Sequence, residues 1–384
     1  MRFEFATATR VLFGPGTVWE VPPLAAGLGR RAFVVIGRSL DRVAPLLDPL
    51  KQHGVDAVLF NVLGEPTTDI ALEAVQRARE NGCDFVIGMG GGSSLDLGKA
   101  VAALLTNRGE LLDYLEVIGR GQTLSHASAP YIAIPTTAGT GSEVTRNAVL
   151  ASPEHRVKVS LRSPLMLPRL AVVDPELTYS MPSAITASTG LDALAQNLEP
   201  YVSRRANPMT SATCREGMRR AARSLRRAYK DGNDAAARED MALASLFGGL
   251  ALANAGLGAV HGLAGPLGGL FPAPHGVVCA RLLPYVMKVN LHALQARMPD
   301  SPAVGRYEEI AQILTGNTSA RATDGINWVQ GLCEALEVPR LSDFGLTPGD
   351  FQLVVEMAQK ASSMQGNPIR LTDEELTHIL TQAL

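Results

Sequence analysis

The sequence predicts two domains, an α/β N-terminal domain with a doubly wound, mostly parallel sheet and an all-α C-terminal domain. Two observations support this fold class. In residues 1–178, short apolar runs typical of buried parallel strands alternate with segments of helical periodicity. In residues 179–384 the strand signals fade, and successive segments have the spacing of helices. We therefore place the domain boundary between residues 178 and 179.

The elements of the N-terminal domain follow from turn residues that separate apolar runs. A short strand around Val11–Phe13 precedes the turn at 14–16, and a helix follows. A helix at 69–81 closes at Gly82, a residue typical of helix C-caps. Further strands are predicted at 31–36, 55–62, 84–88, 131–134 and 170–173.

The C-terminal domain is predicted to be helical throughout. One of its segments is rich in Ala, Leu and Gly and carries His261 near its end. His275 follows Pro272 and Pro274, where the chain is expected to leave helix and turn, so we place it on a loop. The predicted helices are 182–203, 207–229, 233–262, 280–298, 304–315, 322–337, 348–361 and 372–383.

Composition narrows the classes of function. The net charge is −2, so no basic face for nucleic acid is indicated. The stretch 241–280 has no charged residue, but its histidines, prolines and glycines fit a buried core helix better than a membrane span. The start of the chain has no apolar signal-peptide core. The four cysteines are scattered without a CxxC pair, which indicates reduced thiols in the cytoplasm.

Three residues of the C-terminal domain suggest a metal site. His261 and His275 are the only obvious metal-binding side chains in the uncharged stretch, and two buried histidines bonded to backbone are the alternative. Asp192 and Gln196 are four residues apart, so they share one face of a predicted helix. Asp192 lies among apolar residues, and a buried carboxylate needs a partner. A metal held by Asp192, His261 and His275 supplies that partner and keeps a position for substrate oxygen.

Two glycine-rich loops of the N-terminal domain suggest a phosphate-binding site. Gly90–Ser93 follows a buried strand and opens a helix, where free backbone N–H groups favour anions. Its spacing is not GxGxxG, and a tight turn without ligand is the alternative. Thr136–Ser142 follows the next strand, at the sheet edge where ligands bind. Asp96 could bind the cofactor or complement the helix dipole, and Lys158 could contact phosphate or face solvent.

Together these motifs resemble the iron-containing (group III) alcohol dehydrogenase family. The resemblance covers nearly the whole chain and implies the architecture shared with dehydroquinate synthase, a dinucleotide-binding domain followed by a helical metal domain. The matching segments are GGGSSLD at 90–96, IPTTAGTGSEVT at 134–145, VVDPEL at 172–177, GLDAL at 190–194, and VHGLAGPLGG and PAPHG within 260–276.

The resemblance also implies the ligands and the residues that bind them. The cofactor is NAD(P), with its pyrophosphate on Gly91, Gly92 and Ser93 and further contacts from Asp96, Thr136, Thr137, Thr140 and Lys158. One divalent metal, Fe²⁺ or Zn²⁺, is bound by Asp192, His261 and His275, with Gln196 either a fourth, weaker ligand or a support for the ligands. Beyond the metal ligands no catalytic residue is predicted.

Three positions depart from the family pattern. Gln196 replaces the histidine of an Asp-x-x-x-His pair, and an amide oxygen is a weaker ligand than imidazole. Gly265 replaces a histidine four residues after the first late ligand, which removes a possible proton relay and opens space for a bulkier substrate. Arg38 replaces an acidic residue expected to hold the adenine ribose, and a guanidinium there favours NADP over NAD.

We interpret the chain as a metal-dependent NAD(P)-linked alcohol dehydrogenase, or aldehyde or ketone reductase, that transfers hydride between nicotinamide and a small alcohol or carbonyl substrate. Three alternatives remain: a maleylacetate-reductase-like enzyme, a dehydroquinate-synthase-like lyase, and a cofactor-binding protein without turnover. The metal residues argue against the first, whose branch is metal-free, and the second needs more basic residues. We expect no nucleic-acid or membrane partner, and a homodimer or higher homo-oligomer in the cytoplasm.

Overall fold

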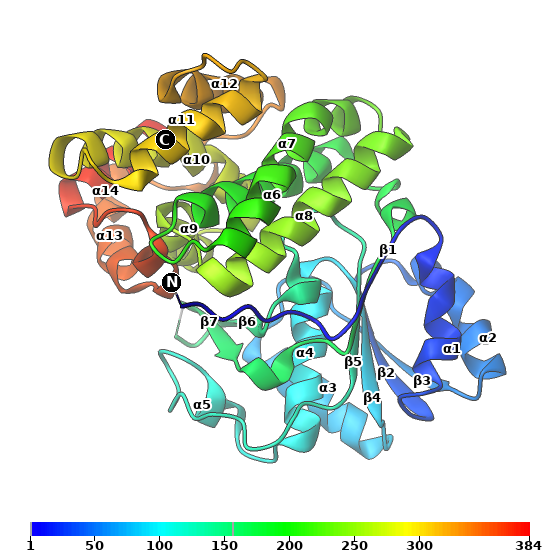
Figure 1. Ribbon diagram of the computed structural model, residues 1–384. Coiled ribbons are helices and arrows are strands. Elements are labelled where there is room, and N and C mark those ends of the chain that lie inside the picture. Colours follow the sequence, from blue (N-terminus) through cyan, green and yellow to red (C-terminus); the bar gives the residue numbers. More distant parts are fainter. Residues whose placement is uncertain (1, 156) are drawn as a thin grey trace. The chain divides into compact units, whose positions relative to one another are not determined.

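The computed structural model of the protein describes residues 2–155 and 157–384, which divide into two units by their contacts. The sheet unit comprises Ala6–Thr137 and Gly141–Tyr179. The helical unit comprises residues 2–5, Ala138–Thr140 and Ser180–Leu384. In Figure 1 the sheet unit is coloured from blue to green and the main part of the helical unit from green to red.

The sheet unit is built on one six-stranded sheet in which every neighbouring pair of strands is parallel. The strand order is β1-β8-β5-β4-β2-β3, so the chain order reverses between β2 and β4. This confirms the predicted doubly wound sheet. The strands are β1 (Val11–Phe13), β2 (Arg31–Ile36), β3 (Asp56–Asn61), β4 (Phe85–Gly90), β5 (Tyr131–Pro135) and β8 (Leu170–Val173).

Helices cover both faces of this sheet, because successive side chains of a strand point to opposite faces. On β2, Phe33 and Val35 pack with apolar residues of α3 and α4, whereas Val34 and Ile36 pack with those of α1 and α2. Both faces of β2 are therefore core. The helices of the sheet unit are α1 (Val21–Ala25), α2 (Ala44–Gln52), α3 (Thr68–Glu80), α4 (Gly92–Thr106) and α5 (Leu111–Tyr114).

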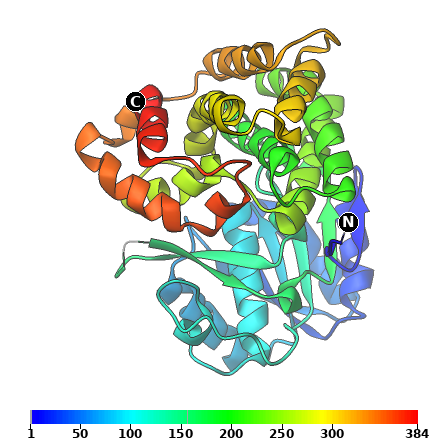
Figure 2. The same cartoon turned by 60° about the vertical axis from the view of Figure 1, so that its left-hand side comes forward.

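An antiparallel hairpin in the sheet unit was not predicted. Strands β6 (Asn147–Ser152) and β7 (Val157–Arg162) pair with each other and not with the main sheet. Figure 2 shows them side by side in green. Buried and partly exposed side chains alternate along β6, the pattern of a strand with one covered face.

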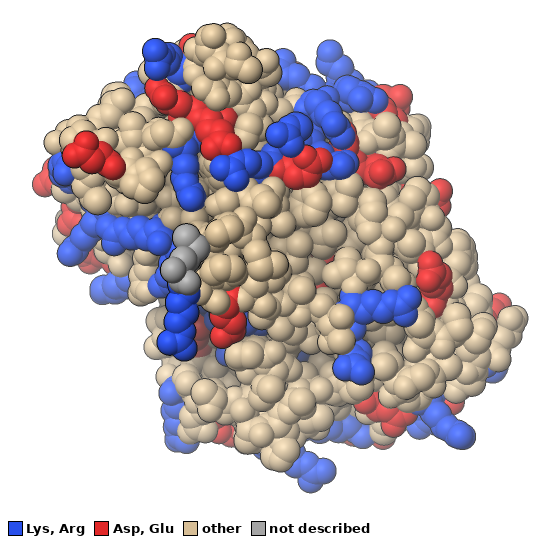
Figure 3. Space-filling view, in the orientation of Figure 1, with Lys and Arg blue, Asp and Glu red and all other residues tan. Residues whose placement is uncertain are grey.

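Nine α-helices and one large apolar core make up the described part of the helical unit from Ser183 onwards. Figure 3 shows Lys and Arg side chains interleaved with Asp and Glu over helix α7. Arg220 and Arg223 of this helix pair with Asp240 of α8. The helices are α6 (Ser183–Val202), α7 (Pro208–Lys230), α8 (Ala235–Ala255), α9 (Ala259–Leu270), α10 (His275–Arg297), α11 (Pro302–Thr315), α12 (Ala322–Ala335), α13 (Phe351–Lys360) and α14 (Asp373–Ala383).

Two predictions about this unit are wrong. The single helix predicted at 233–262 is two helices, α8 and α9, bent by 98°. The break lies at Gly256, whose φ of 67° is a left-handed conformation that glycine adopts without strain. His275 does not lie on a loop but is the first residue of α10, because Pro274 is the residue that caps this helix. Both histidines therefore lie in the first turn of a helix.

Helix α10 is long and apolar enough to cross a membrane by length and composition, and the bent pair α8 and α9 passes the same test together. However, 72% of the apolar window of α10 is buried inside the protein. Its residues Leu282, Leu283 and Leu294 are completely buried in the apolar core of the helical unit. Such burial is what a core helix requires, and lipid contact is not needed to explain its composition.

Candidate functional site

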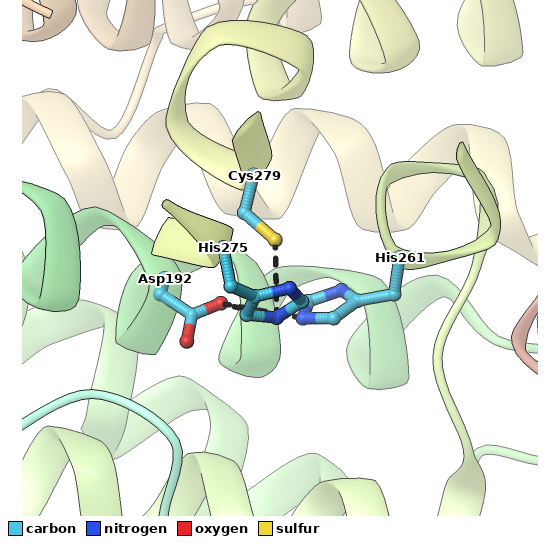
Figure 4. A group of neighbouring side chains, drawn as sticks. All are labelled: Asp192, His261, His275 and Cys279. Atoms are coloured by element: carbon cyan, nitrogen blue, oxygen red, sulfur yellow. Dashed lines mark hydrogen bonds and ion pairs between the residues drawn. The ribbon is translucent and has the colours of Figure 1, made fainter. Parts of the chain in front are cut away.

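Four potential metal ligands converge in the helical unit. Asp192 comes from the middle of α6, His261 from the first turn of α9, and His275 and Cys279 from the first two turns of α10. Figure 4 shows their side chains pointing toward one another. One donor atom from each lies within 4.8 Å of all the others. The structure thus brings together the three residues on which the predicted metal site depends.

Glu199 fixes the orientation of the His261 ring. Its Oε2 atom accepts a hydrogen bond from Nδ1 of His261 at 2.6 Å, and its Oε1 atom accepts one from the backbone N–H of Val260 at 2.7 Å. The proton of the neutral ring therefore stays on Nδ1, which leaves the Nε2 lone pair to face the cluster. A carboxylate behind a histidine is the usual way in which proteins orient an imidazole ligand.

Gln196 fixes the orientation of Asp192 in a similar way. Its Nε2 group donates to Oδ2 of Asp192 at 3.0 Å and to the carbonyl oxygen of Gly139 at 3.2 Å. The other carboxylate oxygen, Oδ1, lies 3.3 Å from Nε2 of His261 and 3.8 Å from Nε2 of His275. One oxygen of Asp192 is thus held by the protein while the other is directed at both imidazole rings.

The two central atoms of this cluster lack hydrogen-bond partners among the described residues. Oδ1 of Asp192 and Nε2 of His261 are both buried and unsatisfied. With the proton of the neutral ring on Nδ1, two acceptors face each other, an arrangement that costs free energy unless a proton or a metal ion lies between them. A carboxylate oxygen and two imidazole nitrogens are the donor set of Zn²⁺ and Fe²⁺ sites, so these residues fit a divalent metal.

The titration behaviour of the cluster also indicates a site for positive charge. Burial opposes a charged ring at His261, but Cys279, Asp192 and Glu199 hold its pKa well above the usual value. Cys279 raises the pKa of His275 in the same way, against the effect of burial. A metal ion that binds here would take the place of a proton.

In the sheet unit, the two glycine-rich loops lie side by side. Gly90 pairs with Pro135 in the parallel register, and the N–H of Thr136 donates to the carbonyl of Gly90 at 2.9 Å. Gly91 is the N-cap of α4, and no side chain caps this helix end. Residues 91–93 are partly exposed, so the N–H groups of the first turn can reach a ligand.

The other residues predicted to bind cofactor are dispersed. Thr136 and Thr137 follow β5 next to this loop, and Thr140 belongs to the helical unit. Arg38 is exposed after the end of β2. Lys158 lies on β7, where its Nζ atom pairs with Glu65 at 2.6 Å.

Asp96 makes its interactions within the sheet unit. Its Oδ1 atom accepts from the Ser142 hydroxyl at 2.5 Å, and its Oδ2 atom accepts from the N–H of Val149 at 3.0 Å. It also pairs with the buried Lys99, whose Nζ lies 3.2 Å from Oδ1. These contacts connect α4 to the segment that follows the second glycine-rich loop, and a role of Asp96 in cofactor binding stays a prediction.

Comparison with known proteins places the chain in a family. Residues 8–175 match the family model described as iron-containing alcohol dehydrogenase, and residues 186–384 match its C-terminal counterpart. The chain is 35% identical to 1,3-propanediol dehydrogenase of Citrobacter freundii, over 99% of this chain and 98% of that relative. The chain belongs to the iron-containing alcohol dehydrogenase family. Choline dehydrogenase of Bacillus subtilis is 33% identical, over 96% and 92% of the two chains.

Solved structures of iron-containing alcohol dehydrogenases share this fold. The crystal structure of a 1,3-propanediol oxidoreductase superposes with a TM-score of 0.93 and 34% identity, and each chain is covered completely. The chain is therefore an oxidoreductase of the CH–OH group that is linked to a nicotinamide cofactor. The lyase, the maleylacetate-reductase-like enzyme and the binding protein without turnover are not favoured by these comparisons.

Three residues that matter to these sites were missed in the sequence. Glu199 is seven residues after Asp192, and Cys279 is four residues after His275, but their places in the site depend on a distant contact with His261 and on the start of α10, which the sequence did not indicate. Arg42 follows β2 and donates from Nη1 to the hydroxyl of Thr136 at 3.1 Å. Its position beside the second glycine-rich loop depends on the order of the strands in the sheet, which no local sequence pattern shows.

Glu143, inside the SEVT motif, is expected to make stability depend on pH. Burial raises its pKa to about 7, while Lys99 opposes the shift. Because the carboxyl ionises more readily in the unfolded chain, its stabilisation is present below pH 4.5 and is lost as the pH rises to about 7. The free energy of unfolding should fall by about 3 kcal/mol over this range from this group alone.

Urea unfolding of Glu143→Gln between pH 4.5 and 8 tests this expectation. The variant should show a smaller decrease of stability with rising pH than the unmodified protein. Glu73→Gln, which changes an exposed carboxylate on α3 of the same unit, is the matched control. Equal pH dependence in Glu143→Gln and the unmodified protein would contradict the assignment.

Proposed function

We propose that this chain is a metal-dependent alcohol dehydrogenase that uses NADP(H) in preference to NAD(H) and interconverts small alcohols with their aldehydes or ketones. The observation that carries the proposal is the buried pair of Asp192 Oδ1 and His261 Nε2, which face each other at 3.3 Å without hydrogen-bond partners. The nitrogen of His275 completes a donor set for a divalent cation.

The protein residues have separate tasks in this proposal. Asp192, His261 and His275 would hold the metal, Gln196 and Glu199 orient two of these ligands, and the N-terminus of α4 binds the pyrophosphate. When bound, the metal would supply Lewis-acid polarisation of the substrate oxygen and the nicotinamide would supply or accept the hydride. Because the metal ligands are largely buried, the electrostatic interactions at this cluster are stronger than in water.

The substrate class is proposed to include alcohols with larger substituents. Gly265 follows His261 by one helical turn on α9, so both residues are on one face of the helix. A Cβ atom built on Gly265 would meet no atom within 4 Å, so this face has open space. The named relatives act on alcohols as different as 1,3-propanediol and choline, which supports a family site that varies in size.

The oxidation of NADPH with a panel of carbonyl compounds tests the proposed activity. The panel should contain short aldehydes, ω-hydroxy aldehydes, branched aldehydes and simple ketones, each assayed with protein that carries bound metal. We expect consumption of one NADPH for each carbonyl reduced, and alcohol oxidation in the reverse direction. Absence of turnover with every member, in protein that binds cofactor and metal, would contradict the proposal.

The proposed preference for NADP(H) depends on Arg38. The residue follows Gly37 at the carboxyl end of β2, beside the point where the strand order reverses and dinucleotides bind. A Cβ atom on Gly37 would lie 3.6 Å from the hydroxyl of Ser94, so this end of β2 abuts the first turn of α4. The first carboxylate after Arg38 in the sequence is that of Asp41, in a short 3-10 helix. No acidic residue therefore lies between Ile36 and Leu40, where one would accept from the ribose hydroxyls.

Arg38→Asp is expected to reverse the cofactor preference. A charge-assisted pair of Arg38 with the 2′-phosphate contributes about 1.5–3 kcal/mol, which corresponds to roughly a ten- to hundredfold preference for NADPH in kcat/KM. The variant should lose this preference because its carboxylate repels the phosphate and accepts from ribose hydroxyls. The measurement is kcat/KM with NADPH and with NADH at saturating carbonyl substrate.

Arg30→Asp is the matched control, because Arg30 immediately precedes β2 and the substitution makes the same change of charge at the opposite end of the strand from Arg38. It should leave the ratio of the two kcat/KM values unchanged. A preference of the unmodified protein for NADH would show that Arg38 does not bind the 2′-phosphate of the adenine ribose. An unchanged ratio of the two kcat/KM values in Arg38→Asp would show the same.

Assembly and location are the remaining parts of the proposal. A homo-oligomer is supported by the edge strand β1, which pairs only with β8 among the described strands and exposes Val11. Light scattering coupled to gel filtration would measure the mass.

A cytoplasmic location is supported by the four cysteines, all of which are free thiols.

A further inference from the structure

Cys279 occupies the place where the cluster lacks a fourth donor. The family pattern has a histidine at the position of Gln196, so the three ligands Asp192, His261 and His275 are one fewer than expected. Cys279 lies one turn after His275 on α10 and is completely buried. Its Sγ atom is 3.5 Å from Nε2 of His275, and it points into the cluster (Figure 4).

Two separations between donor atoms match those of a tetrahedral metal site, and a third is close to them. Zinc binds thiolate sulfur at about 2.3 Å and imidazole nitrogen or carboxylate oxygen at about 2.0–2.2 Å, so donors at the corners of a tetrahedron lie about 3.3–3.6 Å apart. The sulfur of Cys279 lies 3.5 Å from the nitrogen of His275, and the oxygen of Asp192 lies 3.3 Å from the nitrogen of His261. The pair of Asp192 and His275, at 3.8 Å, is slightly wider.

Gln196 does not present its amide oxygen to Asp192. Its Nε2 group faces two atoms that can only accept, the carboxylate of Asp192 and the carbonyl oxygen of Gly139. A flipped amide would place three acceptors against one another in a buried site, where unpaired polar atoms are costly. The chemistry of its neighbours therefore directs the nitrogen of Gln196 toward Asp192, and the amide supports this ligand from behind.

We propose that the Cys279 thiolate is the fourth protein ligand of the metal and that Gln196 is a positioning residue for Asp192. This inference rests on the proposed metal site. Exchange of a histidine for a thiolate softens the donor set, and soft sulfur ligands favour Zn²⁺ over Fe²⁺. The chain is therefore a zinc enzyme within a family named for iron.

Cobalt(II) substitution tests the ligand directly, because Co²⁺ adopts zinc sites and a thiolate–Co²⁺ bond absorbs strongly in the near ultraviolet. Full-length protein is freed of metal by chelation and then titrated with Co²⁺ under anaerobic conditions. We expect one equivalent to bind with a thiolate-to-cobalt charge-transfer band. Cys279→Ser should lose this band, and its affinity for Zn²⁺ should fall at least about tenfold.

Two further variants distinguish the roles of the residues. Cys333→Ser is the matched control, because Cys333 is a buried thiol of the same unit that donates to the carbonyl of Ala280 at 3.3 Å. It should keep the band. Gln196→Ala should also keep the band, while its metal affinity falls roughly ten- to a hundredfold through loss of the support for Asp192.

The outcomes separate this inference from the proposed function. Failure of the unmodified protein to bind Co²⁺ or Zn²⁺ would contradict the metal site itself. Binding without a charge-transfer band, or a band that survives in folded Cys279→Ser, would overturn only the role of Cys279. A competition that needs no variant gives a second readout, because apoprotein offered equal Zn²⁺ and Fe²⁺ should retain zinc, and retention of iron would overturn the inference.

Discussion

His261→Ala is expected to remove the bound metal and to lower kcat/KM at least about a thousandfold. The substitution deletes the Nε2 donor that faces Asp192 at 3.3 Å and leaves Glu199 with a buried carboxylate that has lost its partner. Polarisation of the substrate oxygen by a metal ion lowers the activation free energy by several kcal/mol, and each 1.36 kcal/mol is a factor of ten in rate. Metal content by mass spectrometry and steady-state rates measure the two effects.

The matched control for this variant is His292→Ala. His292 is exposed on α10, the helix that also carries His275, so its substitution removes an imidazole without changing the metal cluster. It should retain both metal and rate. Because an alanine at 261 also leaves space in the core, circular dichroism should establish that the variant is folded. A folded His261→Ala protein with full metal content and full rate would exclude His261 as a ligand.

Gly91→Val is expected to weaken NADPH binding by about a hundredfold without unfolding the protein. The backbone of Gly91 has a φ of −76°, which valine adopts without strain. A Cβ atom there would meet only side-chain atoms of Thr137, at 3.4 and 3.5 Å. The branched side chain would nevertheless stand where a pyrophosphate approaches the N–H groups at the start of α4. Fluorescence titration with NADPH measures the change.

Gly64→Val in the same unit is a suitable control for the added valine. Gly64 is exposed, and a Cβ atom there would meet nothing within 4 Å. Its dissociation constant for NADPH should stay at the value of the unmodified protein. If Gly91→Val binds NADPH equally well, the pyrophosphate does not lie on this loop.

The doubly wound fold could be predicted because its signals are local. The run Arg31–Ile36 is apolar along both faces, as a strand covered by helices on both sides must be, and the structure buries it on both sides. The hairpin of β6 and β7 was missed, because burial alternates along Asn147–Ser152 in the structure while polar and apolar residues do not alternate in its sequence.

The break between α8 and α9 depends on contacts that no local sequence pattern contains. The segment around Gly256 is rich in Ala, Leu and Gly and has the composition of a continuous helix. A Cβ atom at Gly258 would lie 2.8 Å from Oδ1 of Asn367 and 2.9 Å from Oε1 of Glu199, so distant parts of the chain require glycine there. The same break sets His261 at the start of a helix.

The residues of the metal cluster also differ in whether the sequence indicates them. Asp192, His261 and His275 could be singled out because each is a polar group in apolar surroundings, and such groups need partners. Glu199 could not be recognised in this way, because it meets His261 across 62 residues of sequence. In the sequence Cys279 has no feature that distinguishes it from an ordinary buried thiol. The structure begins α10 at His275, which puts His275 and Cys279 on one face of that helix.

The dependence of turnover on bound metal tests the central claim most directly. Protein purified without added metal is analysed for metal, freed of it by exhaustive chelation, and then titrated with Zn²⁺ while NADPH oxidation is followed with an aldehyde that the protein reduces. The account predicts that the rate is lost on chelation and rises in proportion to bound metal until one equivalent per chain is reached. Full turnover by protein that contains no metal would contradict it.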